Sequence, residues 1–208
     1  LRGADVAQID SRARVITLAD GRTQDYGALV STLPLPELVR RIDGVPSAVT
    51  EAAANLRWVR WRYLDVGTRG PVPMREHWVY VPDPAVPFFR VGCYSNALPA
   101  MAPPGRGSLY VELSDRDGPP DLPAIFEALT RMGAIASPDD VEFADVRDIE
   151  YAYVVFDQAY AAARTTIFDY LASLGVRSCG RYGAWIYNSM EDSIIAGMEA
   201  AQWLTTQE

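Results

Sequence analysis

The residues with the clearest chemical potential lie close to the carboxyl end of the chain. Val176 to Cys179 is typical of a short buried strand, and Gly180 and Gly183 free the backbone at its carboxyl end. A helix is expected to begin soon afterwards, at Asn188 or Ser189. The unpaired N–H groups and the macrodipole of a helix amino terminus favour electron-rich oxygens, and open α/β sheets bind nucleotides and flavins where strands end and helices begin. This stretch therefore predicts a nucleotide or flavin site.

Arg181 is a polar side chain in the turn that follows this strand. A guanidinium presents a fork of donors that suits phosphate or carboxylate. A simpler explanation of the helix start stays open. Asn188 with Glu191 fits an ordinary capping box, and Glu191 with Asp192 would stabilise a first helical turn without any ligand.

Composition narrows the classes of protein to which the chain can belong. With 208 residues, of which 49% are hydrophobic and 22% charged, it can bury a core and form one or two domains. The net charge of −8 disfavours nucleic acid as a partner, because phosphate binding depends on clustered cationic side chains. No apolar run approaches the roughly 18 to 20 residues that a membrane-spanning helix needs. We therefore expect no membrane span.

Cysteine and histidine are too few to build a metal site. The chain has two cysteines, Cys93 and Cys179, without a CxxC pair, and one histidine, His77. Neither a disulfide framework nor a spaced zinc site can be assembled from them, so no metal is expected. We interpret the cysteines as small buried hydrophobic residues and His77, beside Trp78, as a packed or surface residue. A cytoplasmic location fits this composition best.

The elements that must position the site are predicted from hydrophobic periodicity and turn residues. In the first part of the chain, Ala28 to Thr32 is nearly all apolar, as in a strand of a buried parallel sheet. Short helices are expected to begin at Pro36 and Pro46, because proline is preorganised for a first helical turn. The other predicted elements are strands at Val6 to Ile9 and Arg14 to Leu18 and a hairpin turn at Asp20-Gly21.

The middle of the chain changes to longer alternating strands rich in aromatic and β-branched residues, which predicts an antiparallel sheet. The candidate strands are Arg57 to Leu64, His77 to Val81, Phe88 to Tyr94 and Ser108 to Leu113. A loop is expected from Asn96 to Gly107, where prolines and glycines gather.

The last part returns to helical periodicity. A helix that includes Ile125 to Met132 is expected to stop at Gly133, and Ala159 to Leu174 is predicted to be a helix that Gly175 ends. Between them, Val141 to Phe156 is mostly typical of a strand. The order of the elements along the chain implies two domains, one inserted into the other.

Three segments together resemble a known superfamily, the amine oxidase-like flavoproteins, which include protoporphyrinogen oxidases and UDP-galactopyranose mutases. The segments are YGALVSTLPLPELVRRI (Tyr26 to Ile42), HWVYVPDPAVPFFRVGCYSN (His77 to Asn96) and CGRYGAWIYNSMEDSIIAG (Cys179 to Gly197). The resemblance covers nearly the whole chain in order, and the last segment is the most specific. The GxGxxG turn of the superfamily is missing, so we expect the chain to be a fragment whose dinucleotide-binding start precedes Leu1.

The resemblance implies a fold of α/β plus α+β class. It consists of a partial FAD-binding domain of the glutathione-reductase type, Rossmann-like, with an inserted antiparallel-sheet substrate domain. The FAD-binding half would comprise residues 1–54 and 158–208, and the substrate domain residues 55–157.

The resemblance also implies which residues contact FAD. Ser31, Thr32, Leu33 and Pro34 would lie at the end of a strand beside the cofactor, and Gly180 would allow its close approach. Ser189, Met190 and Glu191 would place a helix amino terminus near the pyrimidine edge of the flavin. Many amine oxidases carry an acidic residue where this chain has Arg181, so this departure is closer to the mutase pattern. Arg181 is our best candidate for a catalytic residue.

The resemblance predicts an FAD-dependent oxidoreductase, to which this chain contributes the substrate domain and the second half of the flavin site. One alternative is a flavin-dependent isomerase like UDP-galactopyranose mutase, acting on a nucleotide sugar. Another is a non-catalytic binding or assembly module that keeps the fold without the cofactor. We expect the isolated chain to be inactive and to bind FAD weakly or not at all. Expected partners are a small-molecule substrate, possibly anionic, and a second copy of the chain, bound through a sheet edge that a first strand would otherwise cover.

Overall fold

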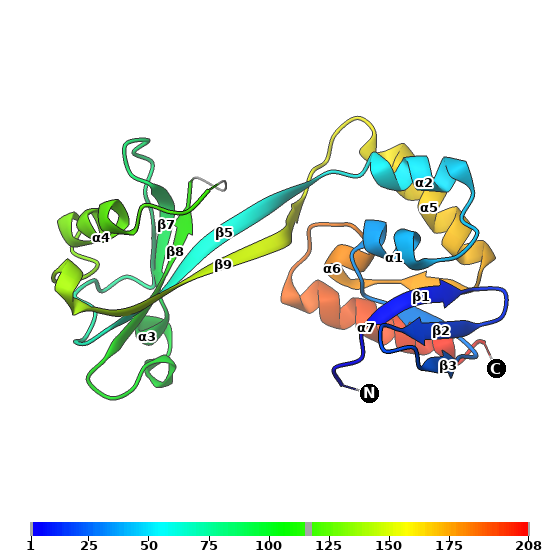
Figure 1. The fold of residues 1–208 in the computed structure, drawn as a ribbon, viewed down its shortest axis with the longest axis horizontal. Helices are drawn as coiled ribbons and strands as arrows, with labels where there is room; N and C mark the ends of the chain where they lie inside the picture. Colours follow the sequence, from blue (N-terminus) through cyan, green and yellow to red (C-terminus); the bar gives the residue numbers. More distant parts are fainter. Residues whose placement is uncertain (1, 115–117, 208) are drawn as a thin grey trace. The chain divides into compact units, whose positions relative to one another are not determined.

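The computed structural model describes residues 2–114 and 118–207 and divides the chain into two compact units. We call Leu1–Val59 with Tyr153–Glu208 the terminal unit, and Arg60–Ala152 the central unit. Both units combine helices with sheets (Figure 1). In the described part of the chain, no helix has the length and apolar character to cross a bilayer.

The terminal unit contains a three-stranded antiparallel sheet and a two-stranded parallel sheet. The antiparallel sheet runs β1 (Val6–Asp10), β2 (Val15–Leu18) and β3 (Thr23–Asp25), and the parallel sheet pairs β4 (Leu29–Ser31) with β10 (Val176–Ser178). The predicted turn at Asp20-Gly21 is present and joins β2 to β3, with Gly21 at a φ of 84°. The strand β3 was not expected, because its three residues are all exposed and polar.

Helices complete the described part of the terminal unit (Figure 1). They are α1 (Leu35–Arg41), α2 (Ser47–Ala54), α5 (Tyr160–Ser173), α6 (Gly180–Gly183) and α7 (Met190–Leu204). Gly175, at a φ of 66°, follows the end of α5 and lets the chain turn into β10. The parallel pairing of β4 with β10 confirms the parallel-type strands predicted at Ala28 to Thr32 and Val176 to Cys179.

The central unit is built on a five-stranded sheet in the order β6-β7-β8-β5-β9. Its strands are β5 (Trp58–Thr68), β6 (Trp78–Tyr80), β7 (Phe88–Cys93), β8 (Gly107–Leu113) and β9 (Val141–Val154), of which β5 and β9 continue into the terminal unit. The pairs β6–β7, β7–β8 and β5–β8 are antiparallel, which confirms the predicted antiparallel sheet. The unit also contains α3 (Tyr94–Ala97), η1 (Pro99–Met101), α4 (Leu122–Arg131) and η2 (Pro138–Asp140).

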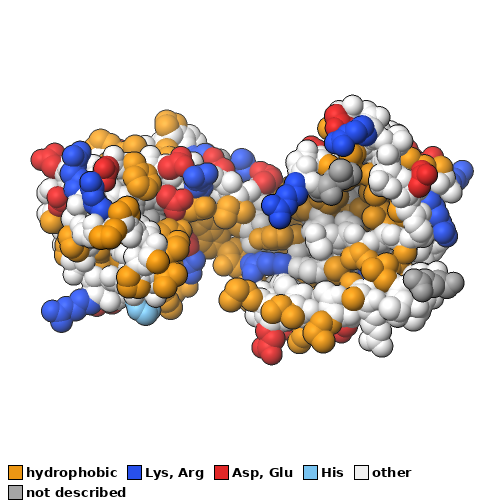
Figure 2. All heavy atoms as spheres, turned by 90° about the horizontal axis from the view of Figure 1, so that it is seen from below, with side chains coloured by type: hydrophobic (Ala, Val, Ile, Leu, Met, Phe, Trp, Pro, Cys, Tyr) orange, Lys and Arg blue, Asp and Glu red, His pale blue; other side chains and the backbone are white. Residues whose placement is uncertain are grey.

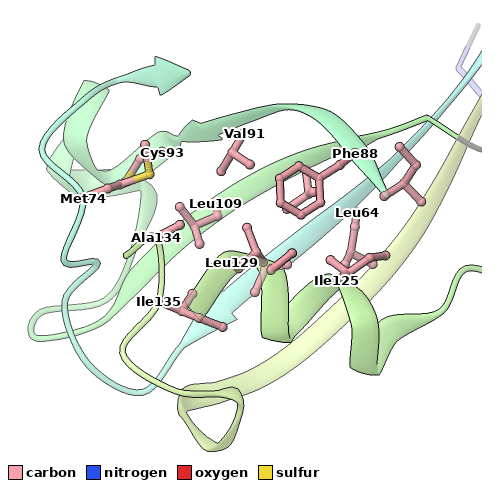
Figure 3. Packing of buried hydrophobic residues seen from close by; sticks show 14 residues of the cluster. Leu64, Met74, Phe88, Val91, Cys93, Leu109, Ile125, Leu129, Ala134 and Ile135 are labelled. Carbon is pink, nitrogen blue, oxygen red and sulfur yellow. The ribbon is translucent and has the colours of Figure 1, made fainter. Parts of the chain in front are cut away.

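The core of the central unit lies between this sheet and α4 (Figure 3). Ile125 and Leu129 of α4 point toward Leu64, Leu109 and Val91 of the strands (Figure 3). The helix begins at Asp121, whose side chain accepts a hydrogen bond from the backbone of Ala124, and it ends before Gly133, as predicted. Successive residues of a strand point to opposite faces of the sheet. One face of this sheet is therefore buried, and the other carries polar and aromatic side chains.

Candidate functional site

The carboxyl ends of β4 and β10 meet at the turn that leads into α6. Cys179 donates a backbone hydrogen bond to Ser31 over 2.9 Å, and the Ser178 hydroxyl donates to the Gly183 carbonyl over 2.8 Å. A side chain on Gly183 would come within 3.0 Å of the Ser31 carbonyl oxygen and 3.3 Å of the Thr32 Cα. Gly183 therefore permits the close packing that brings the end of β4 against α6.

The segment between α6 and α7 is held from α5. The Tyr160 hydroxyl donates to the carbonyl of Trp185, and the Arg164 Nε donates to the carbonyl of Ala184, each over 2.8 Å. Trp185 itself is fully buried and has a φ of 53°, which is unusual for a residue with a bulky side chain. Such conformations persist where the surroundings fix them. The segment that carries Arg181 to the start of α7 is thus rigidly anchored.

Arg181 lies in a box of aromatic rings. Its guanidinium carbon is 4.9 Å from the ring centroid of Tyr153 and 4.9 Å from that of Tyr187. The two rings are nearly parallel, with centroids 5.9 Å apart, and Arg181 Nη1 donates to the Asn188 carbonyl over 3.3 Å. Cation–π contacts and this hydrogen bond fix the direction of the guanidinium, so little of its conformational freedom remains to be lost on binding an anion.

The amino terminus of α7 is capped by Ser189, one residue after the cap expected from Asn188 and Glu191. Ser189 Oγ accepts from the backbone N–H of Asp192 over 3.2 Å, and Asp192 Oδ2 accepts from the backbone N–H of Ser189 over 2.8 Å. The hydrogen bonds that Ser189 donates, the backbone one foremost, hold the pKa of Asp192 below its usual range. In the described part of the chain, the N–H groups of Met190 and Glu191 have no hydrogen-bond acceptor. The capping box thus leaves donors available at this helix end.

A cavity of about 310 Å³ opens at this helix end. Asn188 lines it and is only 8% exposed, yet its Oδ1 has no hydrogen-bond partner among the described residues. Buried acceptors are usually hydrogen-bonded in folded proteins, so this oxygen is an acceptor that a group entering the cavity could use. The lining residues are Arg181, Asn188, Ser189, Met190, Ser193 and Ile194.

The structure brings some of the predicted site residues together and separates others. Arg181, Ser189 and Met190 share this cavity, whereas Gly180, at a φ of 76°, lines a neighbouring one along β10. Glu191 lies exposed in the first turn of α7. The cofactor roles of all these residues remain predictions.

The four predicted residues at the end of β4 are not in the wall of the cavity that contains Arg181. Ser31 is buried and its Oγ accepts from the backbone of Leu33 over 3.2 Å, while Thr32 is exposed. Pro34 caps α1. These residues approach the rest of the site through the backbone contact at Gly183.

Sequence reasoning missed the aromatic partners of Arg181. Neither Tyr187, which lies close to Arg181 in the sequence, nor Tyr153 was singled out as its partner. The signal available was the run of aromatic residues after Arg181, namely Tyr182, Trp185 and Tyr187. The contribution of Tyr153, from β9, depends on the fold and could not be found from spacing.

The central unit carries a second arginine among aromatic rings, on the sheet face opposite its core. Arg90 of β7 forms an ion pair with Glu112 of β8, and its guanidinium carbon is 5.5 Å from the ring centroid of Tyr80 and 5.9 Å from that of Trp61. Glu112 is 6% exposed, and its Oε2 has no partner among the described residues. This face is a second candidate for binding an anionic or aromatic group.

Elsewhere, basic and acidic side chains are mixed and do not form patches of a single charge. On the face shown in Figure 2, basic side chains are interspersed with acidic ones rather than aligned in a stripe. On β5, Arg60 pairs with Glu150 and Arg62 with Asp148. Among the residues that the structure describes, no three histidine, cysteine, aspartate or glutamate side chains form a group that could hold a metal ion.

The chain is similar to solved structures of other proteins over most of its length. No protein-family model matches the chain. A crystal structure of reduced UDP-galactopyranose mutase is similar over 99% of this chain and 46% of that chain, with a TM-score of 0.80 and 24% sequence identity. A structure described as a protoporphyrinogen oxidase from Exiguobacterium sp. is similar over 92% of this chain and 44% of that chain, with a TM-score of 0.64 and 12% identity.

An oxidoreductase from Methanosarcina mazei is similar over 96% of this chain and 49% of that chain, with a TM-score of 0.58 and 15% identity. The chain thus spans about half the length of each of these proteins. At these identities the comparisons establish the fold alone. The chain has a mixed helix-and-sheet fold similar to that of part of each of these proteins.

Proposed function

We propose that residues 1–208 form part of a flavin-dependent enzyme of the amine oxidase-like superfamily. In this proposal, residues 1–54 and 158–208 supply the second half of a Rossmann-like FAD-binding domain, and residues 55–157 form an inserted substrate domain. The observation that carries the proposal is the amino terminus of α7, where available N–H donors, the unpartnered Asn188 Oδ1 and Arg181 meet at one cavity. Likeness to three flavoprotein-like folds supports it.

The residues at this helix end suit the polar edge of a flavin. That edge carries both acceptors and a donor, which would pair with the N–H groups of Met190 and Glu191 and with Asn188 Oδ1. The positive end of α7 would stabilise negative charge on the bound ring. Gly180 and the end of β4, from Ser31 to Pro34, would border the remainder of the cofactor. When bound, FAD would supply the redox chemistry by accepting or returning electrons.

Arg181 would bind and orient an anionic group beside the flavin. Because Tyr153 and Tyr187 hold its guanidinium in place, a phosphate or carboxylate would meet a fork of donors that is already aligned. The anion would be part of the small-molecule substrate or of the cofactor.

A second candidate, within the same class of flavoenzyme, is an isomerase that acts on a nucleotide sugar. Two observations favour it over an amine or porphyrinogen oxidase. The structural likeness is greater to UDP-galactopyranose mutase, with a TM-score of 0.80 against 0.64 for the Exiguobacterium protein. In addition, an arginine follows Gly180 where many amine oxidases have an acidic residue, and a nucleotide sugar offers the phosphates that a guanidinium binds best.

The test is FAD titration of the natural protein from which these residues come, followed by flavin fluorescence. We expect a stoichiometric complex, and we expect Arg181→Gln to weaken binding of the cofactor or of a sugar nucleotide about 10- to 100-fold, the effect of losing a charge-assisted hydrogen bond. Arg181→Lys should recover only part of the loss, because lysine keeps the charge without the fork. Arg22→Gln, which makes the same charge change at the exposed turn before β3 and outside this cavity, should leave binding unchanged.

Three outcomes would decide against the proposal. A natural protein that binds no FAD would favour the non-catalytic module, as would a start codon directly before Leu1. Equal effects of Arg181→Gln and Arg22→Gln would remove the Arg181 site from the mechanism. Separately, tight yellow complexes of residues 1–208 alone would contradict our expectation that this chain binds FAD weakly.

A further inference from the structure

The strand β9 forms one edge of the five-stranded sheet in the central unit (Figure 1). Its neighbour on one side is β5, and in the described part of the chain no strand lies on its other side. The strand is 14 residues long and contains no proline or lysine, whereas β6 at the opposite edge has only 3 residues. Proteins commonly protect a sheet edge by keeping the strand short or by placing proline or lysine on it. The long edge of β9 lacks these protections.

Two large apolar side chains of β9 are exposed. Phe143 is 56% exposed and Ile149 is 41% exposed. Because alternate residues of a strand share a face, and these two are an even number of positions apart, both lie on the same face of the sheet. Phe143 lies against Gly67, where an added Cβ would come within 2.1 Å of its ring. A long edge strand with exposed apolar side chains is a typical site of association.

The charged side chains of β9 do not prevent a second strand from approaching, because each is paired with an opposite charge within the chain. The pairs are Glu142 with Arg106, Asp148 with Arg62, Glu150 with Arg60 and Asp145 with Arg147. Both signs are therefore present along the edge, and neither is in excess there.

The sequence of β9 is complementary to itself in one antiparallel register. When a twofold axis perpendicular to the sheet passes beside Val146, residues at equal distances before and after Val146 lie opposite each other in two copies of the strand. Asp145 then faces Arg147 of the second copy, and Phe143 faces its Ile149. An axis beside Asp145 or Arg147 would instead place two like charges opposite each other, which is unfavourable.

We propose that β9 pairs antiparallel with β9 of a second copy of this chain, with Val146 at the twofold axis. The two sheets would become continuous through main-chain hydrogen bonds, the mode by which an open strand edge binds another strand. Phe143 of each copy would pack against Ile149 of the other, and opposite charges would alternate at the axis through Asp145 and Arg147. The occupant is a second copy because this one segment supplies both halves of each apolar and charged pair.

This interface differs from the one expected from the sequence, which would use an edge of the parallel sheet formed by β4 and β10. All the residues that would pair around Val146 belong to the central unit. The inference goes beyond the proposed function and does not depend on bound FAD.

The first test is sedimentation velocity of the natural protein over a range of concentrations. We expect a dimer at high micromolar concentration. Asp145→Arg and Arg147→Asp should each raise the dissociation constant about 10-fold or more, because like charges would then face each other across the axis. Glu127→Arg, at an exposed position of α4, makes the same kind of charge change and should leave the dissociation constant unchanged.

An equimolar mixture of the two charge variants tests the register and also shows that both variants are folded. The Asp145→Arg chain carries two arginines beside Val146, and the Arg147→Asp chain carries two aspartates there. Opposite charges face each other again only when one chain of each kind is present. We therefore expect the mixture to form a heterodimer whose dissociation constant is close to that of the unchanged protein.

A disulfide cross-link tests which residue lies at the axis. Residues directly opposite each other in antiparallel strands have Cα atoms about 4.5–5.5 Å apart, a distance that a disulfide spans. We expect Val146→Cys to give a covalent dimer on mild oxidation. Ala144→Cys should not, because its two copies would lie about 13 Å apart. The native Cys93 and Cys179 are buried and should not contribute.

Several results would overturn the proposal. A protein that stays monomeric at every concentration has no such interface. A dimer that Asp145→Arg leaves intact, or one that Ala144→Cys cross-links and Val146→Cys does not, uses another surface or register. If the protein dimerises as described but binds no FAD, the proposed function fails while this interface stands.

Discussion

Gly183 is the residue on which the contact between β4 and α6 depends. A Cβ there would lie 3.0 Å from both the Ser31 carbonyl oxygen and the Ser178 Oγ, and backbone atoms cannot move aside as a flexible side chain can. We expect Gly183→Ala to lower the free energy of unfolding by about 1–3 kcal/mol, the usual cost of overpacking. Urea unfolding followed by tryptophan fluorescence measures this.

Gly197 provides the control for that substitution. It lies inside α7 with open space around the position of a Cβ, so Gly197→Ala should raise the free energy of unfolding by about 0.5–1 kcal/mol through helix propensity. If both alanines stabilise the protein, the packing at Gly183 is not what requires glycine.

For single residues, the sequence identifies those whose type is unusual at their position. It does not identify the side chains that the fold brings into contact with them. Arg181 could be singled out because many amine oxidases carry an acidic residue at the position after Gly180, where this chain has an arginine. Its stacking between Tyr153 and Tyr187 could not, since Tyr153 belongs to a strand far away in the sequence. The unpartnered Oδ1 of Asn188 is likewise a property of the folded site.

Among the elements, α7 depends most on its own cap, because the rest of the helix is so little buried. We expect Ser189→Ala to cost about 1 kcal/mol at pH 7, a typical value for a lost N-cap. The effect should depend on pH. The pKa of Asp192 is lower in the folded protein than in the unfolded chain, so its contribution is present at neutral pH and is lost as pH falls below about 4.

The urea midpoints of wild type and Ser189→Ala should therefore converge between pH 7 and pH 3. Thr205→Ala, at the other end of the same helix, is the control, and its effect should not follow this acid transition. A Ser189→Ala effect that is equally large at pH 3 would contradict the role of the capping box.

Elements with strong periodicity or clear end signals were predicted well. Helix α5 was placed to within a residue at each end because Gly175 stops it, and β7 and β8 because their apolar residues alternate. Several short elements were missed, among them β3 and α3. The strand β3 has no buried face, and α3 lies at the start of what was predicted as a loop, where Ser95 and Asn96 give no helical signal. The start of α7 was ambiguous because Asn188 and Ser189 are both good caps.

For the whole molecule, the central unit has a hydrophobic core of its own. Its buried cluster draws on β5, β7, β8 and α4 and includes no residue of the terminal unit. We therefore expect residues 60–152 expressed alone to unfold cooperatively in urea, with near-ultraviolet circular dichroism of a packed protein. Leu129→Ala, a fully buried core position, should lower its stability by about 2–5 kcal/mol. A gradual, non-cooperative transition would show that the central unit needs the rest of the chain.

The change between helical and alternating periodicity predicts a division of the chain into domains, but it does not predict which strands pair. The sheet of β4 and β10 is formed by segments that lie far apart in the sequence. Periodicity shows which residues a strand buries and does not show how many strands a sheet contains.

The pairing of β4 with β10 has a consequence for the order of events during folding. Leu29 and Val176 are brought together across the entire central unit, and an unfolded intervening chain would impose a large entropic cost on closing that loop. The chain leaves the terminal unit at a point where the Val155 N–H bonds the Arg57 carbonyl over 3.0 Å, so its exit and return are adjacent. A central unit that folds early would bring these two points together and shorten the loop, whereas during synthesis β4 cannot pair until β10 has left the ribosome.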